Sequence, residues 1–515
     1  MANKEAFIQI VKNGYSFKGE SFRIGCAMLD GEAIQGNDIF LPLKTMNRHG
    51  LIAGATGTGK TKTLQILAEG LSNASVPVLM MDIKGDLSGI AAPGTINEKI
   101  KERLAKIGGE YMPEGFPVEL MTLSDQKGVR MRATVSEFGP ILISKILGLN
   151  DTQEGLVAVI FKYCDDQKMP LLDLKDFIKV LQFISNEGKN EIEKIYGKIA
   201  SSSTGTILRK VIELQQQGAD IFFGEPSFEV DDLMRIADDG RGIINILRVT
   251  DMQNRPKLFS TFMLQLLAEL YASLPEVGDT DKPKLVLFID EAHLVFQEAT
   301  NALLQQIETV IKLIRSKGVG IFFCTQNPQN IPPGVLAQLG LKIQHALRAF
   351  TAADRKTIKQ AAQNYPETEF YDVAEMITQL GIGEAFITLL NEKGVPSPLV
   401  HTMLVPPVSR MDILTENEIE SIISNSKLVK KYDAFIDEKS AYEILTNKLT
   451  EVAEKQKNEE EEKKADKKGM NDKGFFDNPM VKQVGRTAAS VITRSLLGAL
   501  GLGGRSRSRK TNNWF

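Results

Sequence analysis

Residues 54–61 have the types and spacing of a phosphate-binding loop. They read GATGTGKT, which fits the pattern G-x-x-x-x-G-K-[ST]. Glycines let the backbone fold closely around phosphates with its N–H groups inward, Lys60 reaches the β- and γ-phosphates, and the Thr61 hydroxyl binds Mg²⁺. The pattern predicts a site for ATP and Mg²⁺, with a chance glycine turn as the alternative. The residues expected to bind the nucleotide are Gly54, Ala55, Thr56, Gly57, Thr58, Gly59, Lys60, Thr61 and Lys62.

An acidic pair follows an apolar run later in the chain. KLVLFID (284–290) ends in Asp290, and Glu291 comes next. The run predicts a buried strand beside the strand of the phosphate loop. Asp290 would then lie near the Mg²⁺ held by Thr61, and Glu291 would polarise the attacking water. Such pairs are common and mostly structural, but this position favours catalysis, and the glutamate favours hydrolysis over transfer of the phosphoryl group to a metabolite.

Three further polar residues follow predicted strands. Asp82, in VLMMDIKGD (78–86), is predicted to hold water on Mg²⁺, with a cap or turn role as the alternative. Gln326 is predicted to sense the γ-phosphate, with a turn amide before Pro328 as the alternative. For His293 we expect a hydrogen-bonding role, because no His or Cys lies at metal-ligand spacing from it.

Arginines can complete a site of this kind by stabilising charge in the transition state. Arg48, Arg315 and Arg348 are the candidates in the sequence. For each of them a surface ion pair is the alternative. In ring-shaped ATPases the arginine often comes from the next subunit.

Strands alternating with helices must position these residues. The strands are expected at 49–54, 76–82, 117–123, 241–249, 284–290, 319–325, 341–349 and 384–390, and the main helices at 61–74, 257–274 and 302–316. Nearly continuous apolar strands of this kind indicate an α/β fold with a mainly parallel sheet covered on both faces.

Changes in the pattern divide the chain into four parts. Residues 1–45 read as a short β-rich segment that includes FIQI as a strand, and residues 46–410 read as the ATPase domain. Apolar residues at helical spacing over 137–235 predict a helical insertion in that domain. Residues 411–470 read as a charged helical extension and residues 471–515 as a basic tail.

Composition excludes several classes of protein. With 515 residues, 43% hydrophobic and 25% charged, the chain is typical of a soluble globular protein. A net charge of −3 excludes a globally basic nucleic-acid coat but not a local basic channel. Cys26, Cys164 and Cys324 are too few and too widely spaced for a disulfide framework. With neither a signal peptide nor a spanning segment in sight, we expect a cytoplasmic protein.

The tail at 471–515 carries eight basic residues against two acidic ones. Its GRSRSRK end could contact DNA phosphates. VITRSLLGALGLGG could lie on a neighbouring subunit or on an anionic membrane. A disordered or weakly docked tail is the remaining interpretation.

Four segments together resemble the HerA/FtsK branch of P-loop ATPases: RHGLIAGATGTGKT, MMDIKGDLSG, LPEVGDTDKPKLVLFIDEAHLVF and CTQNP. More narrowly, they resemble the bacterial YjgR-like family with a HerA-like helicase C-terminal domain. The resemblance covers roughly residues 10–410. It implies a RecA-like fold, a hexameric ring and action on double-stranded DNA, with a nuclease partner for HerA itself. Only about 45 residues precede the ATPase domain, so the N-terminal β-barrel of HerA is expected to be truncated or missing.

The resemblance also implies roles for individual residues. Lys60 and Thr61 match the Walker A pair, and Asp290 and Glu291 match Walker B. Asp82 matches the acid at the end of the second strand, and Gln326 matches the sensor glutamine. Arg315 matches the arginine finger that is given to a neighbouring subunit, and Arg48 matches a second functional arginine.

Two functions from different classes follow. The first is an ATP-driven DNA translocase or helicase. The alternative is a non-motor ATPase that acts as a switch or assembly factor on protein partners. A metabolite kinase is a weaker third, because Glu291 favours water as the acceptor and no acceptor site or lid is evident in the sequence.

Overall fold

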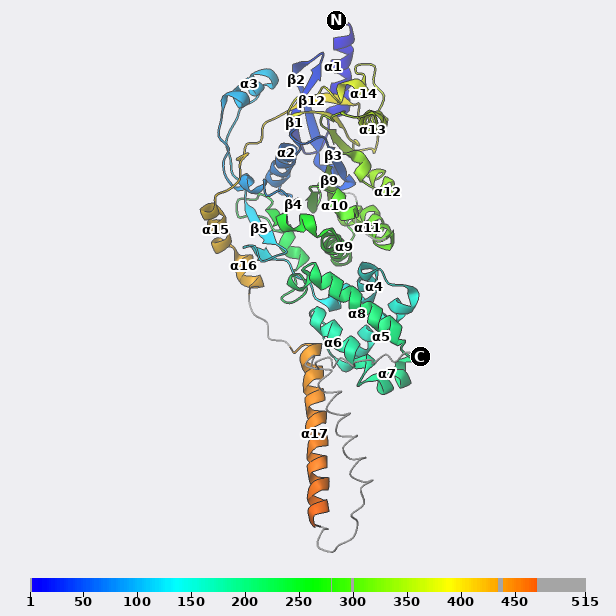
Figure 1. The fold of residues 1–515 in the computed structure, drawn as a ribbon. Helices are drawn as coiled ribbons and strands as arrows, with labels where there is room; N and C mark the ends of the chain where they lie inside the picture. Colours follow the sequence, from blue (N-terminus) through cyan, green and yellow to red (C-terminus); the bar gives the residue numbers. More distant parts are fainter. Residues whose placement is uncertain (1, 279, 298–300, 434–438, 470–515) are drawn as a thin grey trace, which may run out of the picture. The chain divides into compact units, whose positions relative to one another are not determined.

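The computed structural model describes residues 2–278, 280–297, 301–433 and 439–469 (Figure 1). The chain divides into two compact units, residues 1–445 and residues 446–515. The basic tail predicted at 471–515 lies outside the described residues. No described helix is both long enough and apolar enough to cross a membrane.

A twelve-stranded sheet organises the first unit. Its order is β2-β1-β12-β11-β10-β3-β9-β8-β4-β7-β5-β6. The strands are β1 Ser21–Leu29, β2 Glu32–Pro42, β3 Gly50–Ala53, β4 Val78–Asp82, β5 Val118–Thr122, β6 Val129–Arg130, β7 Ile244–Arg248, β8 Leu285–Ile289, β9 Val319–Thr325, β10 Leu341–Gln344, β11 Glu384–Thr388 and β12 Val400–Leu404. Pairing is parallel from β10 through to β6 and antiparallel among β11, β12, β1 and β2. The predicted α/β fold with a mainly parallel sheet is confirmed.

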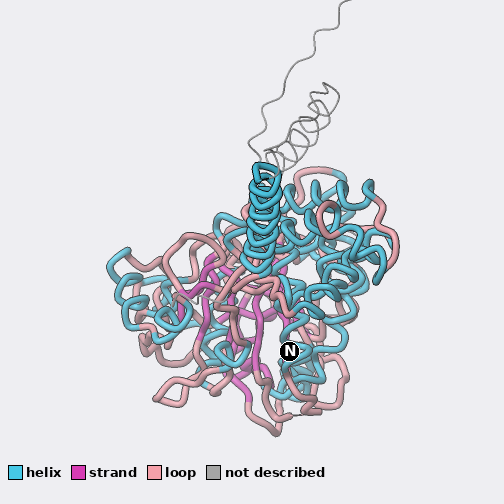
Figure 2. The backbone as a smooth tube through the Cα atoms, turned by 90° about the horizontal axis from the view of Figure 1, so that it is seen from below, coloured by secondary structure: helices cyan, strands magenta, loops and turns pink. Residues whose placement is uncertain are grey.

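Helices cover both faces of the sheet, as Figure 2 shows with the strands between them. The longer helices are α1 Ala2–Tyr15, α2 Lys60–Asn73, α3 Glu98–Ile107, α4 Val135–Leu147, α5 Asp151–Gln167, α6 Leu174–Ser185, α7 Lys189–Tyr196, α8 Ser201–Gln216, α9 Pro256–Ser273, α11 Asn301–Ile314, α13 Ala352–Ala362, α15 Glu416–Asn425, α16 Lys427–Tyr432 and α17 Ala441–Gly469. Three single-turn helices are α10 His293–Phe296, α12 Pro333–Leu336 and α14 Val373–Met376. The central strands are buried along their whole length, as continuous apolar runs require.

The helical character predicted over 137–235 is confirmed by α4 to α8. Helices α4, α5 and α6 each follow a cap residue whose side chain accepts the N–H of the residue three positions later, while that later residue's side chain accepts the cap's own N–H. The cap residues are Thr134, Asn150 and Asp173. This capping box satisfies N–H groups that the first turn leaves without an intrahelical partner. The insertion returns to the sheet at β7.

The strand predicted at FIQI is wrong, because residues 2–15 form helix α1. Phe7, Val11 and Tyr15 recur every four residues and are buried together, which is the period of a helix and not of a strand. The Phe7 ring packs edge-on against Phe370 and Tyr371. The next two strands, β1 and β2, are confirmed, and they join the main sheet through β12.

The strand predicted at 341–349 ends early, at Gln344. Beyond that point the backbone leaves the sheet, and the carbonyl of Ala346 accepts the N–H of Ala55 in the phosphate loop. The residues after β10 therefore support the loop instead of extending the sheet.

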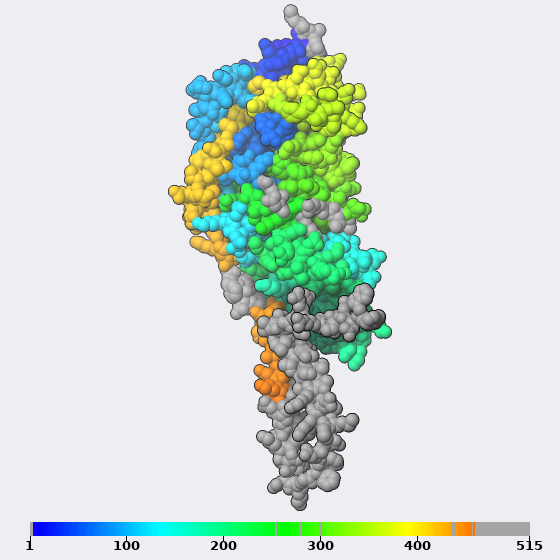
Figure 3. Space-filling view, viewed as in Figure 1, coloured from blue at the N-terminus to red at the C-terminus, as the bar shows by residue number. Residues whose placement is uncertain are grey.

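Residues 405–414, here called the strap, connect β12 to α15 and hydrogen-bond to Gln65 of α2. Atoms of this part of the chain are yellow to orange in Figure 3. The strap is fixed by Glu69 of α2, whose carboxylate accepts the N–H groups of Val408 and Ser409 and the Ser409 hydroxyl. Burial raises the pKa of Glu69 to about 7, although these hydrogen bonds lower it.

We expect the stability that Glu69 contributes to the folded protein to fall as the pH rises to 7, because ionisation leaves a buried charge. In the folded protein Glu69 keeps its proton up to about pH 7, whereas in the unfolded chain it releases the proton near pH 4.5. The stability that protonated Glu69 contributes is therefore fully present below pH 4.5 and is lost as the pH rises to about 7. The wild type should lose on the order of 1–3 kcal/mol more stability than Glu69→Gln between pH 5 and pH 8. Urea denaturation at both pH values measures this difference, with the exposed Glu98→Gln as control. Parallel profiles of wild type and Glu69→Gln would contradict it.

Candidate nucleotide site

The phosphate loop connects β3 to α2. Its glycines Gly57 and Gly59 have φ of 78° and 114°, a region that side chains disfavour. A Cβ on Gly59 would also lie 3.2 Å from the backbone nitrogen of Gly383. The loop therefore requires glycine both for its conformation and for its close neighbours.

Strand β9 and the segment after β10 hold the loop in place. The N–H of Gly54 donates to the carbonyl of Thr325 at 3.2 Å, and that of Ala55 donates to Ala346 at 2.8 Å. The Lys60 ammonium lies inside its own loop, where it donates to the carbonyls of Gly54 at 2.6 Å and Ala55 at 3.0 Å. Burial lowers the pKa of Lys60, against the field of the nearby acids. The lysine is thus within the concavity that cradles phosphates in loops of this kind.

The acidic pair follows β8 directly, and both side chains are buried. Glu291 has a φ of 45°, a left-handed conformation that costs about 1–3 kcal/mol for a residue with a side chain. Lys84, from the loop after β4, places its Nζ 2.6 Å from Glu291 Oε1 and 3.7 Å from Asp290 Oδ2. Sequence reasoning did not select Lys84, since its position becomes apparent only once β4 and β8 are known to be neighbours.

Gln326 and His293 complete the surroundings of Glu291. Gln326 Nε2 donates to Oε1 at 3.4 Å, and His293 Nδ1 lies 3.4 Å from Oε2. Burial raises the pKa of Glu291, but Lys84, Gln326 and His293 together hold it below its ordinary value. Burial raises the pKa of Asp290, against the ammonium of Lys84. The predicted meeting of the loop, the acidic pair and the glutamine at one edge of the sheet is what the structure shows.

Asp82 lies at the end of β4, near this edge, but its carboxylate is hydrogen-bonded to the backbone of the turn that follows. Its carboxylate accepts the N–H groups of Gly85 at 2.7 Å, Asp86 at 3.1 Å and Leu87 at 3.2 Å. This is the turn role that the sequence left open as the alternative. The Thr61 hydroxyl instead donates to Asp86 Oδ2 at 3.3 Å. Asp86 was missed, although a second acid four residues after Asp82 in DIKGD was a usable signal.

Residues at the site fit a divalent cation. Among the described residues, Asp290 Oδ2, Glu291 Oε2 and Asp86 Oδ1 are buried oxygens without a hydrogen-bond partner. Buried carboxylate oxygens require a proton, a donor or a cation, and oxygen ligands suit Mg²⁺. Thr61, Asp290 and Asp86 could hold the ion.

The three candidate arginines lie at two different edges of the sheet. Arg48 ends the short helix η1 Leu43–Arg48 before β3, and Arg315 begins η6 Arg315–Lys317 before β9. Both therefore lie at the amino end of parallel strands, opposite the phosphate loop. Arg348 follows β10 at the loop's edge, and its side chain is exposed.

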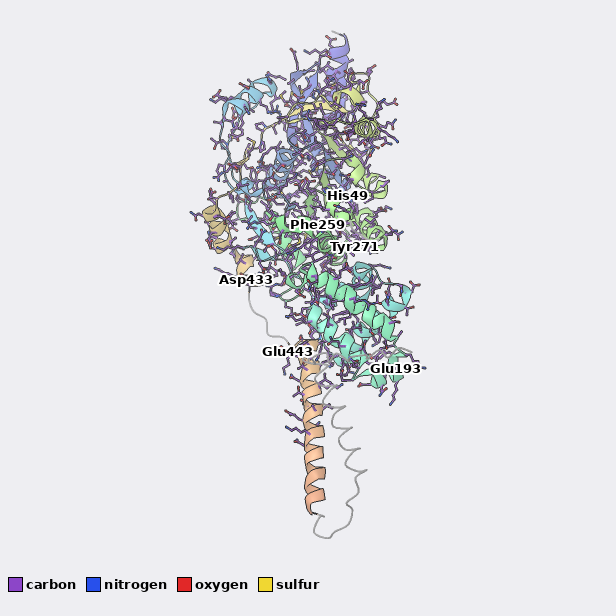
Figure 4. All side chains as sticks on the ribbon, in the orientation of Figure 1. His49, Glu193, Phe259, Tyr271, Asp433 and Glu443 are labelled. Atoms are coloured by element: carbon purple, nitrogen blue, oxygen red, sulfur yellow. The ribbon has the colours of Figure 1, made fainter. Side chains whose placement is uncertain are left out.

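His49, which is labelled in Figure 4, lies at the amino end of the parallel strands, directly before β3. Its Nε2 lies 2.8 Å from the Ile311 carbonyl, and its Nδ1 accepts the N–H of Ile321. Burial lowers the pKa of His49 to about 4, and the charge of Arg315 contributes to this lowering. The hydrogen bond with the Ile311 carbonyl acts in the opposite direction. The influence of Arg315 on His49 places that arginine near the start of β3. Arg48 and Arg315 are thus separated from the phosphate loop of their own chain by the length of the strands.

Comparison with known proteins gives consistent results. The sequence model of the family described as "Helicase HerA-like C-terminal" matches residues 28–507. The chain is 23% identical over 364 residues to the DNA double-strand break repair helicase HerA of Sulfolobus acidocaldarius, covering 69% of this chain and 66% of that protein. It is 24% identical over 389 residues to HerA of Saccharolobus solfataricus, covering 75% and 69%. It therefore spans about two thirds of the length of these curated relatives.

Among solved structures, the fold is similar to the bacterial conjugative coupling protein TrwB. The TM-score is 0.50 at 13% identity, covering 79% of this chain and 94% of that chain. At this level of identity the likeness concerns the fold alone, which is RecA-like.

Two substitutions distinguish the turn role of Asp82 from a metal role. Asp82→Asn would set an amide N–H against a backbone N–H and should lower the free energy of unfolding by about 1–3 kcal/mol. Asp86→Asn should leave stability within about 0.5 kcal/mol of wild type and weaken Mg²⁺-dependent nucleotide binding. Urea unfolding in EDTA, followed by nucleotide titrations with and without Mg²⁺, gives both quantities. A stable Asp82→Asn variant with lost Mg²⁺ dependence would refute the turn assignment.

Proposed function

The chain belongs to the HerA-like helicase C-terminal family, and from this premise we propose that it is a cytoplasmic ATP-hydrolysing motor that translocates along or unwinds double-stranded DNA. The observation that carries the proposal is the meeting of Lys60, Glu291 and Gln326 at the carboxyl edge of one parallel sheet. DNA as the substrate rests on the relatives, which are named as DNA double-strand break repair helicases. The narrower YjgR-like assignment and the nuclease partner stay predictions.

In the proposed reaction the loop amides and Lys60 bind the β- and γ-phosphates. Thr61 and Asp290 would hold Mg²⁺, which when bound neutralises phosphate charge, and Asp86 would position its water. Glu291 accepts the proton of the attacking water. Gln326, which already contacts Glu291, lies where it can report whether the γ-phosphate is present.

Arg48 and Arg315 support an assembly of several copies. Both lie at the edge opposite their own loop, so an arginine finger from either must act on the site of a neighbouring chain. Two apolar side chains at the loop edge, Phe350 and Ile382, are 85% and 71% exposed. Gly383, next to Ile382, donates to the Thr58 carbonyl. A second copy of the chain would cover both side chains, and the resemblance suggests a hexameric ring.

Glu291→Gln tests the motor directly. We expect the substitution to lower ATP turnover about 10²–10⁴-fold, because the general base is lost. Linear double-stranded DNA should stimulate the wild type and not the variant. Phosphate release is measured with and without DNA, in samples sized by light scattering. Slow hydrolysis by a monomer that is indifferent to DNA would instead favour a switch or assembly factor acting on protein partners.

Mixing two inactive variants tests the arginine. Arg315→Ala subunits keep Glu291, and Glu291→Gln subunits keep Arg315, so only a mixed interface holds both groups. If Arg315 acts on the neighbouring site, equal mixing should restore about a quarter of wild-type turnover in a closed ring. An arginine that acts within its own chain would give no recovery. The same mixture with Arg48→Ala, and one with the exposed Arg348→Ala, compares the three candidates.

A further inference from the structure

Lys84 is the side chain nearest the acidic pair that the predicted mechanism does not use. Strand β4 pairs in parallel with β8, with Met81 opposite Ile289. The residues that follow these strands therefore meet at the same edge. The Lys84 side chain is 33% exposed, whereas those of Asp290 and Glu291 are 3% and 8% exposed. The ammonium thus covers the buried carboxylates on the side that faces solvent.

A fixed turn aims Lys84 at this point. Asp82 holds three successive N–H groups after Lys84, from Gly85 to Leu87. Gly85 has a φ of 78°, which closes the turn, and a Cβ there would meet Thr250 at 3.2 Å. The backbone of Lys84 is therefore positioned, while its four-carbon stem can still turn. A lysine of this kind carries a mobile charge on a fixed base.

The charges at the site set up a competition. Lys60 is hydrogen-bonded to its own loop and Lys84 to Glu291. The two ammonium groups influence each other, since the charge of Lys84 contributes to lowering the pKa of Lys60. Phosphates that bind at Lys60 therefore lie within reach of the field of Lys84. These phosphates carry more negative charge than one carboxylate, so they compete with Glu291 for the ammonium of Lys84. While that ammonium stays 2.6 Å from Glu291 Oε1, its positive charge opposes the transfer of a proton to that oxygen.

We propose that Lys84 changes partner during the cycle: it pairs with Glu291 when the nucleotide site is empty and with the terminal phosphate when ATP is bound. Glu291 is then free to act as a base only when a γ-phosphate is present. Hydrolysis returns Lys84 to Glu291. This inference rests on the proposed function and adds a residue that links recognition of the γ-phosphate to activation of the base.

The test compares ADP with a non-hydrolysable ATP analogue on Lys84→Met, which removes the charge and keeps the length of the side chain. ADP affinity should stay within about twofold of wild type, whereas analogue affinity should fall about 10–100-fold, as for the loss of a charge-assisted contact. Lys84→Arg should retain part of the analogue affinity. The exposed Lys99→Met is the matched control. Equal loss for both nucleotides, or no loss for either, would show that Lys84 is only a structural counter-ion.

A double-mutant cycle makes the exchange itself visible. Glu291→Gln removes the competing carboxylate, so the free Lys84 should bind the analogue several-fold more tightly than in wild type. That gain should vanish in the Lys84→Met, Glu291→Gln double variant. A gain that persists without Lys84 would overturn the partner exchange. These are binding measurements, so they remain decisive even if the wild type proves not to be a DNA motor, while turnover with DNA tests the motor separately.

Discussion

The parallel register of β3, β9, β8 and β4 is the constraint on which the site depends. Ala53 lies opposite Thr325, Phe323 opposite Ile289, and Met81 opposite Ile289, so the four strands end almost level with one another. Each strand is followed by a different functional segment. Since the strands are buried on both faces, polar groups can gather only where they end. Residues more than 200 positions apart in the sequence meet there without any further element to bring them together.

This constraint also explains which parts of the site were predictable. Continuous apolar runs identify the strands, and in a parallel sheet the polar residues after such runs share one edge. The placement of Lys60, Asp290, Glu291 and Gln326 at one edge therefore follows from the sequence alone. Lys84 and Asp86 were missed because the shape of one short turn determines where they point. The roles proposed for Arg48 and Arg315 would need a second chain, which no pattern within one chain can supply.

The errors in the fold have local physical reasons. The segment at 7–10, FIQI, is short and mostly apolar like a strand, but the burial of Phe7, Val11 and Tyr15 together stabilises a helix. Strand β12 was not predicted. It reads VHTML and contains two polar residues, yet it is buried throughout because β1 and β11 flank it on both sides. In both segments the tertiary contacts, and not the local sequence pattern, determined the secondary structure.

Charge balance at the carboxyl edge links the binding of nucleotide to the binding of the cation. With Lys84 beside them, the buried carboxylates of Asp290 and Glu291 have a counter-charge. If phosphates attract that ammonium away, both carboxylates remain buried without one, which is costly in a protein interior. A divalent cation at Asp290 and Thr61 would restore the balance, so each ligand should favour the other. The buried oxygens that lack hydrogen-bond partners lie where such a cation would be needed. The ion pairs of Lys84 with Asp290 and Glu291 therefore suit this edge to a charged substrate and its metal.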